Sequence, residues 1–202
     1  MMRTVAGDDR MIGLPAPPGI RTGVVGMWVA LGSVLMLFTA LTSAYIVRAG
    51  MSDDWRPLWM PGLLWLSTAL ILASSVSFEV ARRSLKKGSE QGYSRALLLT
   101  VLLGIGFLAT QLLAWRQLVA QGIYLDSNPH SSFFYVLTGV HGVHLLGGIL
   151  ALDYLLLRTW QRAGVKSVAQ EKRQAVADVV GIYWHFMDGL WVYLFLLLFF
   201  WR

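Results

Sequence analysis

Four ionisable side chains stand inside stretches that otherwise carry no charge, and they are the residues best placed to do chemistry. They are His141 and His144, three residues apart, and His185 and Asp188, also three residues apart. Residues at this spacing lie on one face of a helix, so the two members of each pair can act together. An ionisable group inside a membrane costs free energy, which makes each of them a functional candidate.

Three kinds of chemistry suit this set. With Thr138, the four residues can form a hydrogen-bonded cluster that fixes how two helices pack, and this structural role is the preferred interpretation. A His–carboxylate pair can also handle protons or meet a lipid headgroup. His141 and His144 have a spacing that allows them to share a metal ion, but two ligands on one helix cannot reach opposite faces of a haem.

The elements that must position these residues are long apolar helices. The chain has 202 residues, 56% hydrophobic and only 14% charged, which is too apolar for a soluble domain of this size. Lys, Arg, Asp and Glu are absent from residues 22–47, 57–78, 96–115 and 131–152, and Asp188 is their single representative in residues 179–201. At ~1.5 Å per residue, each run is long enough to cross about 30 Å of hydrocarbon. The sequence therefore predicts an all-α membrane protein.

We expect a surface tail at residues 1–21, followed by a single transmembrane domain at 22–202. Its five helices have approximate bounds 22–47, 57–78, 96–115, 131–157 and 178–201. The fourth and fifth helices are joined by a short loop, which predicts antiparallel neighbours. Counted along the helix axes, His144 and Asp188 lie within about one turn of each other in depth. A His–carboxylate contact between these two helices is therefore expected.

The basic residues predict the orientation of the chain. Lys and Arg number three in the tail and five in each of the second and fourth loops, against two, one and one in the first loop, third loop and C-terminal end. By the positive-inside rule, the N-terminus is cytoplasmic and the C-terminus periplasmic. The residues expected to contact lipid headgroups are Arg82, Arg83, Lys86, Lys87, Arg158 and Arg162. Long uncharged runs separate the basic groups, so we do not expect nucleic-acid binding.

The composition also excludes several sites. The chain has no cysteine, so thiolate catalysis, iron–sulfur clusters and Cys-ligated zinc are ruled out. No His-Glu-x-x-His pattern of a metalloprotease is present.

Four glycines, Gly139, Gly142, Gly147 and Gly148, make the fourth predicted helix thin and allow a neighbouring helix to approach closely.

Two longer segments resemble a known family. Residues 132–145 read SFFYVLTGVHGVHL, and residues 183–191 read YWHFMDGLW. Both resemble signatures of cytochrome c oxidase subunit III, and they occur in the family's order. The motif aromatics are Phe133, Phe134, Tyr183, Trp184 and Trp191. The resemblance extends over nearly all of the chain after residue 21.

The resemblance implies an accessory, non-redox subunit of a haem–copper terminal oxidase, foremost a respiratory cytochrome c oxidase that reduces oxygen to water and translocates protons. It implies no active site, metal or redox cofactor in this chain, with haem and copper in partner subunits. Expected partners are oxidase subunits I and II and bound phospholipid, while cytochrome c contacts the complex elsewhere. The expected roles are stabilising the catalytic subunit, supporting proton uptake and binding lipid, in the bacterial cytoplasmic (inner) membrane.

Two alternatives remain open at this point. The chain can be subunit III of a quinol oxidase or of a complex related to nitric-oxide reductase, because such a subunit need not touch the electron donor. It can instead be a standalone proton-coupled transporter that uses the His/Asp residues.

The sequence also departs from the family, with five predicted helices where many members have seven. The carboxylates usual in the family are replaced by Val34 and Ala114, which favours a structural role for the polar cluster.

Overall fold

The computed structural model describes residues 18–51, 61–161 and 168–200, and the side chains of residues 23–51, 61–160 and 172–200. The chain forms five α-helices: α1 (Pro18–Met51), α2 (Leu63–Lys86), α3 (Glu90–Ala120), α4 (Pro129–Gln161) and α5 (Val168–Phe200). Each is long and apolar enough to cross a membrane. The predicted all-α protein with five membrane helices is confirmed.

The helix ends differ from the predicted bounds. Helix α1 begins at Pro18, inside the expected tail, because proline suits the first position of a helix. Helix α2 begins at Leu63, later than expected. Gly88 adopts a left-handed φ of 74° after α2, and the Ser89 hydroxyl caps α3 by accepting from the Gly92 amide at 3.3 Å. Most of the expected surface tail, residues 1–17, and the expected start of the second helix, residues 57–60, lie outside the described residues.

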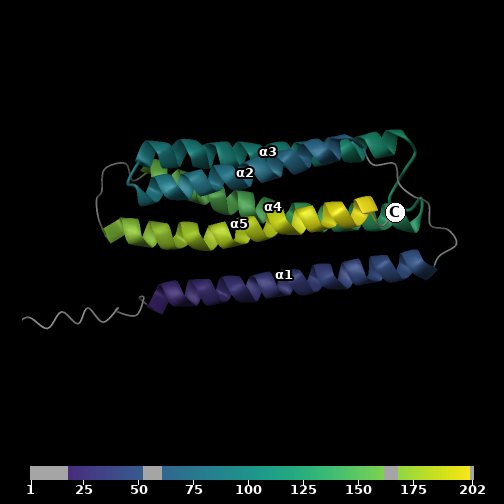
Figure 1. The fold of residues 1–202 in the computed structure, drawn as a ribbon, viewed down its shortest axis with the longest axis horizontal. Coiled ribbons are helices and arrows are strands. Elements are labelled where there is room, and N and C mark those ends of the chain that lie inside the picture. The colour runs from purple at the N-terminus through teal and green to yellow at the C-terminus, as the bar shows by residue number, and fades with distance from the viewer. Residues whose placement is uncertain (1–17, 52–60, 162–167, 201–202) are drawn as a thin grey trace, which may run out of the picture.

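Helices α2, α3, α4 and α5 form a bundle in which each helix has two neighbours (Figure 1). Helix α2 packs against α3 and α5, and α4 packs against α3 and α5. The predicted pairing of the last two helices is therefore confirmed. Helix α1 lies at one side and, among the described helices, contacts α4 and α5. Only 11% of its most apolar stretch is buried, so most of its surface faces outward.

Large aromatic side chains fill the core. Those less than 2% exposed are Phe38, Tyr45, Phe78, Tyr93, Phe107, Phe134, Trp184 and Trp191. The Trp184 indole packs against two glycines, and a Cβ added at Gly104 of α3 or Gly148 of α4 would lie 3.0 or 3.1 Å from it. These glycines let both α3 and α4 approach the indole closely.

The other glycines predicted to thin α4 differ in their surroundings. A Cβ at Gly139 would lie 3.3 Å from the Trp115 ring, which is a tight contact. Gly142 and Gly147 have an ordinary 3.9 Å to their nearest neighbours. The expected close approach is therefore confirmed at Gly139 and Gly148 only.

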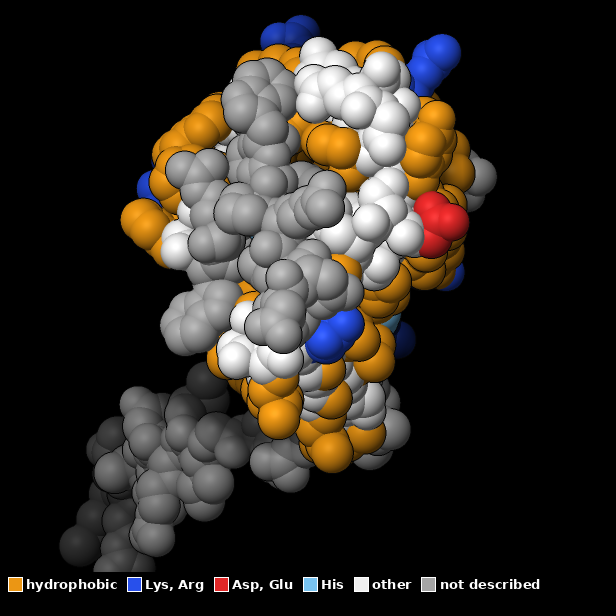
Figure 2. Space-filling view, turned by 90° about the vertical axis from the view of Figure 1, so that its right-hand side faces the viewer, with side chains coloured by type: hydrophobic (Ala, Val, Ile, Leu, Met, Phe, Trp, Pro, Cys, Tyr) orange, Lys and Arg blue, Asp and Glu red, His pale blue; other side chains and the backbone are white. Residues whose placement is uncertain are grey.

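The outer faces of the bundle are apolar. Figure 2 looks onto the end where α4 begins and α5 ends, and hydrophobic side chains cover most of the rim seen from that direction. Trp65, near the start of α2, is 58% exposed, as expected for a residue of an interfacial aromatic belt. The side of the membrane that each end faces stays a prediction.

Candidate functional site

The polar side chains of α5 meet those of α2 along one line, which we call the α2–α5 seam. It consists of four contacts, between Thr68 and Trp191, Ser74 and Trp184, Ser75 and His185, and Arg82 and Asp178. Thr68, Ser75 and Arg82 are spaced by seven residues, as are Asp178 and His185. Seven residues are close to two helical turns, so each set faces one way. The seam extends along about 21 Å of α2.

Two tryptophans form one part of the seam. The Trp191 Nε1–H donates to Thr68 Oγ1 at 3.0 Å, and the Trp184 Nε1–H donates to Ser74 Oγ at 3.2 Å. Both indoles are at most 1% exposed, and a buried indole N–H needs an acceptor. Trp184 also packs against Gly104 of α3 and Gly148 of α4, so one side chain of α5 contacts three neighbouring helices.

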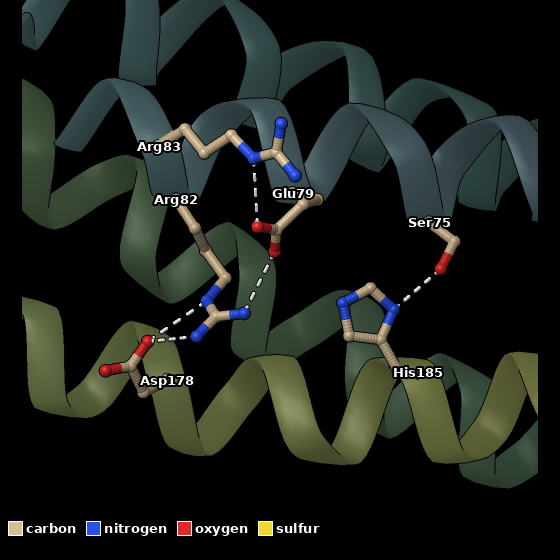
Figure 3. Close-up of polar contacts among 6 residues, drawn as sticks. All are labelled: Ser75, Glu79, Arg82, Arg83, Asp178 and His185. Atoms are coloured by element: carbon tan, nitrogen blue, oxygen red, sulfur yellow. Dashed lines mark hydrogen bonds and ion pairs between the residues drawn. The ribbon is translucent and has the colours of Figure 1, made fainter. Parts of the chain in front are cut away.

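The charged end of the seam is an ion-pair network (Figure 3). The Arg82 guanidinium donates to Asp178 Oδ1 of α5, with Nε at 3.0 Å, and to Glu79 Oε2 at 2.9 Å. Arg83 contacts the other oxygen of Glu79 at 3.2 Å. Arg82 is the less exposed of the two arginines, with 23% of its side chain accessible against 71% for Arg83. Arg82 therefore joins α5 to α2, whereas the ion pair of Arg83 lies within α2.

His185 and Asp188 are turned toward α2. The Ser75 hydroxyl and His185 Nδ1 are hydrogen-bonded at 2.6 Å (Figure 3). Asp188 is 3% exposed and has Ser75 beside it. Among the described residues, no hydrogen bond of normal geometry reaches either oxygen of its carboxylate. Buried polar groups without such a bond are rare in proteins, which makes Asp188 an unusual feature of the core.

The polar residues of α4 are arranged differently. Thr138 accepts from the Trp115 indole of α3 at 3.2 Å. His141 is fully buried, and its ring lies 5.3 Å from Trp191 with neither nitrogen hydrogen-bonded to a described residue. His144 donates from Nδ1 to the Val140 carbonyl of its own helix at 2.8 Å.

The expected hydrogen-bonded cluster of Thr138, His141, His144, His185 and Asp188 is therefore wrong as drawn from the sequence. No hydrogen bond joins these five side chains in the described part of the chain. The polar face of α5 points to α2, where small hydroxyls accept its donors. Helices α4 and α5 meet instead through the Tyr183 hydroxyl, which donates to the His144 carbonyl at 2.8 Å, and through the glycine contact of Gly148.

Sequence reasoning missed Thr68, Ser75 and Asp178 as members of a site. The available signal was the seven-residue spacing on both helices, which places each set on a single face. The hydroxyls of α2 also pair with α3, because Gln111 Nε2 of α3 donates to Ser67 Oγ at 2.7 Å.

The two positions of the missing family carboxylates, Val34 and Ala114, are both buried among apolar groups.

The remaining motif aromatics pack against α1 and within the core. Phe133 lies edge-on to Tyr45 of α1 at 5.6 Å, and Phe134 is fully buried.

Lys86 and Lys87 are exposed at the end of α2. Arg162 lies outside the described residues. Among the residues that the structure describes, no group of three or more His, Asp or Glu side chains is placed to hold a metal ion.

Comparisons with known proteins agree with the fold and the motifs. The family model for cytochrome c oxidase subunit III matches residues 14–202. A probable cytochrome c oxidase subunit 3 of Nocardia farcinica is 36% identical over 182 residues, covering 88% of this chain and 87% of that one. Its counterpart in Mycobacterium tuberculosis is 33% identical with the same coverage. A quinol oxidase subunit 3 of Bacillus subtilis is 29% identical over 180 residues, covering 87% and 85%.

Proposed function

The chain belongs to the cytochrome c oxidase subunit III family, and from this premise we propose that it is the accessory, non-redox subunit of a respiratory cytochrome c oxidase. In this proposal it lies beside oxidase subunits I and II in a bacterial cytoplasmic membrane. It stabilises the catalytic subunit and supports proton uptake and lipid binding. The haem and copper centres that reduce oxygen belong to the partner subunits.

The α2–α5 seam is the observation that carries this role. Its hydroxyls, indoles and ion pairs are used in contacts between helices, and such contacts fix the rotation and depth of α5 relative to α2. A frame held in this way can present constant outer faces to a larger membrane protein. Those faces are apolar, as on α3, where the large exposed side chains include Leu98, Leu102, Ile105 and Leu112.

The choice of cytochrome c as electron donor rests on similarity. The matched relatives named cytochrome c oxidase subunit 3 are up to 36% identical to this chain, whereas the quinol oxidase subunits are 29% identical. A quinol oxidase is the second candidate, because these subunits also align over most of the chain.

Mild purification of a tagged chain tests the proposal directly. We expect larger subunits to co-purify and the sample to show the reduced-minus-oxidised spectrum of haem. Oxidation of reduced cytochrome c by that sample, compared with oxidation of a quinol, separates the two donors. A haem-free chain that transports a solute by itself would contradict the proposal.

Deletion of the chain tests the accessory role. The oxidase from the deletion strain should keep its haem content but lose activity sooner during continuous turnover. Re-expression of the wild-type chain should restore the lifetime. Loss of a haem on deletion would show that the chain takes part in the redox site.

A further inference from the structure

A cavity opens on the side of the bundle, along the apolar part of α5. Helices α1 and α2 both lie near α5, but among the described helices only α2, α4 and α1 contact it, and α1 does not contact α2. A strip of α5 therefore stays uncovered, and a cavity of about 380 Å³ opens where this strip meets α1. We call it the lateral cavity. Its lining includes Phe38 and Thr39 of α1 and His185, Phe186, Gly189 and Tyr193 of α5.

Gly189 leaves open space on this face of α5. His185, Gly189 and Tyr193 follow one another at intervals of four residues and so share one side of the helix. A Cβ added at Gly189 would meet nothing within 4 Å. The backbones of His185 and Tyr193 are about 12 Å apart along the helix axis, with the glycine between them. A larger residue at position 189 would occupy the space between the imidazole and the phenol.

The lateral cavity lies at the depth of the hydrocarbon layer. The apolar run of α5 extends from residue 179 to residue 201, so His185 lies six residues from one end and Tyr193 eight residues from the other. At ~1.5 Å per residue, they are about 9 and 12 Å inside the two edges of the run. Phospholipid headgroups lie outside these edges. A ligand of this cavity must therefore dissolve in the membrane.

Two polar groups of the cavity are available to such a ligand. The Ser75 hydroxyl is hydrogen-bonded to His185 Nδ1 at 2.6 Å (Figure 3), and with this hydroxyl as the donor the neutral imidazole carries its proton on Nε2. Neither His185 Nε2 nor the Tyr193 hydroxyl is hydrogen-bonded to a residue in the described ranges. A polar group without a partner is costly in hydrocarbon. Both groups therefore favour a ligand that accepts hydrogen bonds.

The walls of the cavity suit a flat ring. Phe38, Phe186 and Tyr193 all line it, and aromatic side chains pack well against other rings. Its volume of about 380 Å³ falls within the range of about 300–1,000 Å³ that is typical of small-molecule sites. A para-quinone combines a flat ring, two carbonyl oxygens that accept hydrogen bonds and a tail that dissolves in hydrocarbon. An acyl chain at this depth offers no acceptor to the two donors.

We propose that the lateral cavity binds the head of a membrane-soluble para-quinone. The ring occupies the space beside Gly189, and its carbonyl oxygens accept from His185 Nε2–H and from the Tyr193 hydroxyl. The tail of the quinone extends into the lipid. This inference concerns binding alone and does not depend on which electron donor the oxidase uses.

Photolabelling with an azido derivative of decylubiquinone tests the site. The sample is the detergent-solubilised full chain with any subunits that co-purify, and mass spectrometry of its peptides locates the label, which we expect within residues 35–42 or 185–193. Gly189→Leu fills the open space and should lower this labelling by about tenfold. The matched control Gly26→Leu changes an equally open helical glycine outside the cavity lining and should lower labelling less than about twofold.

Two further arms separate hydrogen bonding from the filling of an apolar space, and neither depends on the stability of Gly189→Leu. Tyr193→Phe keeps the ring but removes the hydroxyl, and it should weaken competition by unlabelled decylubiquinone by about fivefold. Decylbenzene has the same tail without oxygens and should not compete with the label. Equal competition by decylbenzene would make the cavity a site for any apolar chain and overturn the proposal. Label outside the two segments, or labelling that Gly189→Leu leaves unchanged, would also overturn it.

Discussion

Alanine substitution at Gly148 should destabilise the bundle, whereas the same substitution at Gly142 on the same helix should not. Both residues lie inside α4, where alanine is favoured over glycine by about 0.5–1 kcal/mol. At Gly142 the nearest atom to an added Cβ is 3.9 Å away, so nothing opposes that gain. The expected result at Gly142 is a stabilisation of this size.

At Gly148 the added Cβ would lie 3.1 Å from both the Trp184 and the Tyr183 rings. Trp184 cannot move away freely, because Gly104 of α3 also lies close to its ring and Ser74 accepts its N–H. Overpacking of this kind costs about 1–3 kcal/mol. After the alanine preference is subtracted, Gly148→Ala should lose about 1 kcal/mol, and at most about 2.5 kcal/mol.

The assay is unfolding of the purified chain in detergent micelles, followed by the helical circular dichroism signal as SDS is added. Trp184→Phe supplies a second check, because a smaller ring makes room for the new methyl group. In the Trp184→Phe background, Gly148→Ala should cost less than in the wild type, with a coupling of at least about 0.5 kcal/mol. The close packing inferred around Trp184 is incorrect if Gly148→Ala is as stable as Gly142→Ala, or if the two substitutions are additive.

Two other predictions concern polar contacts of α2. Arg82→Gln should lower the free energy of unfolding by about 1 kcal/mol, because it removes the ion pair between α2 and Asp178 of α5. This value is the upper end for a solvent-screened pair. Arg83→Gln removes an ion pair within α2 and should change the free energy of unfolding by less than about 0.5 kcal/mol in the same SDS titration. Ser67→Ala should cost about 0.6–1.7 kcal/mol by removing the acceptor of the Gln111 amide. Adding Gln111→Leu should recover part of that loss, since both partners are then apolar, and a double variant less stable than Ser67→Ala would contradict this bond.

The helices themselves could be predicted from the sequence because their signal is local. A run of about twenty residues without charge must be helical in lipid, since every backbone group has to bond within its own segment. The i,i+3 and i,i+4 pairs of Glu79 with Arg82 and Arg83 are local in the same sense, and the structure contains both. The helix ends were less predictable, because polar residues beyond the hydrocarbon continue the helices into the headgroup layer.

The sequence by itself determined the number of helices, their apolar character and which polar residues lie within them. The tertiary structure decided what each polar residue contacts: His185 faces Ser75 of α2, and His141 packs against the rings of Phe107 and Trp191 with neither nitrogen hydrogen-bonded to a described residue. Periodicity identifies the polar face of a helix but not the neighbour it meets. Hydropathy does not resolve this either, because lipid and protein core are equally apolar. Leu31 and Val29 of α1 show this, being 3% and 66% exposed with the same chemical character.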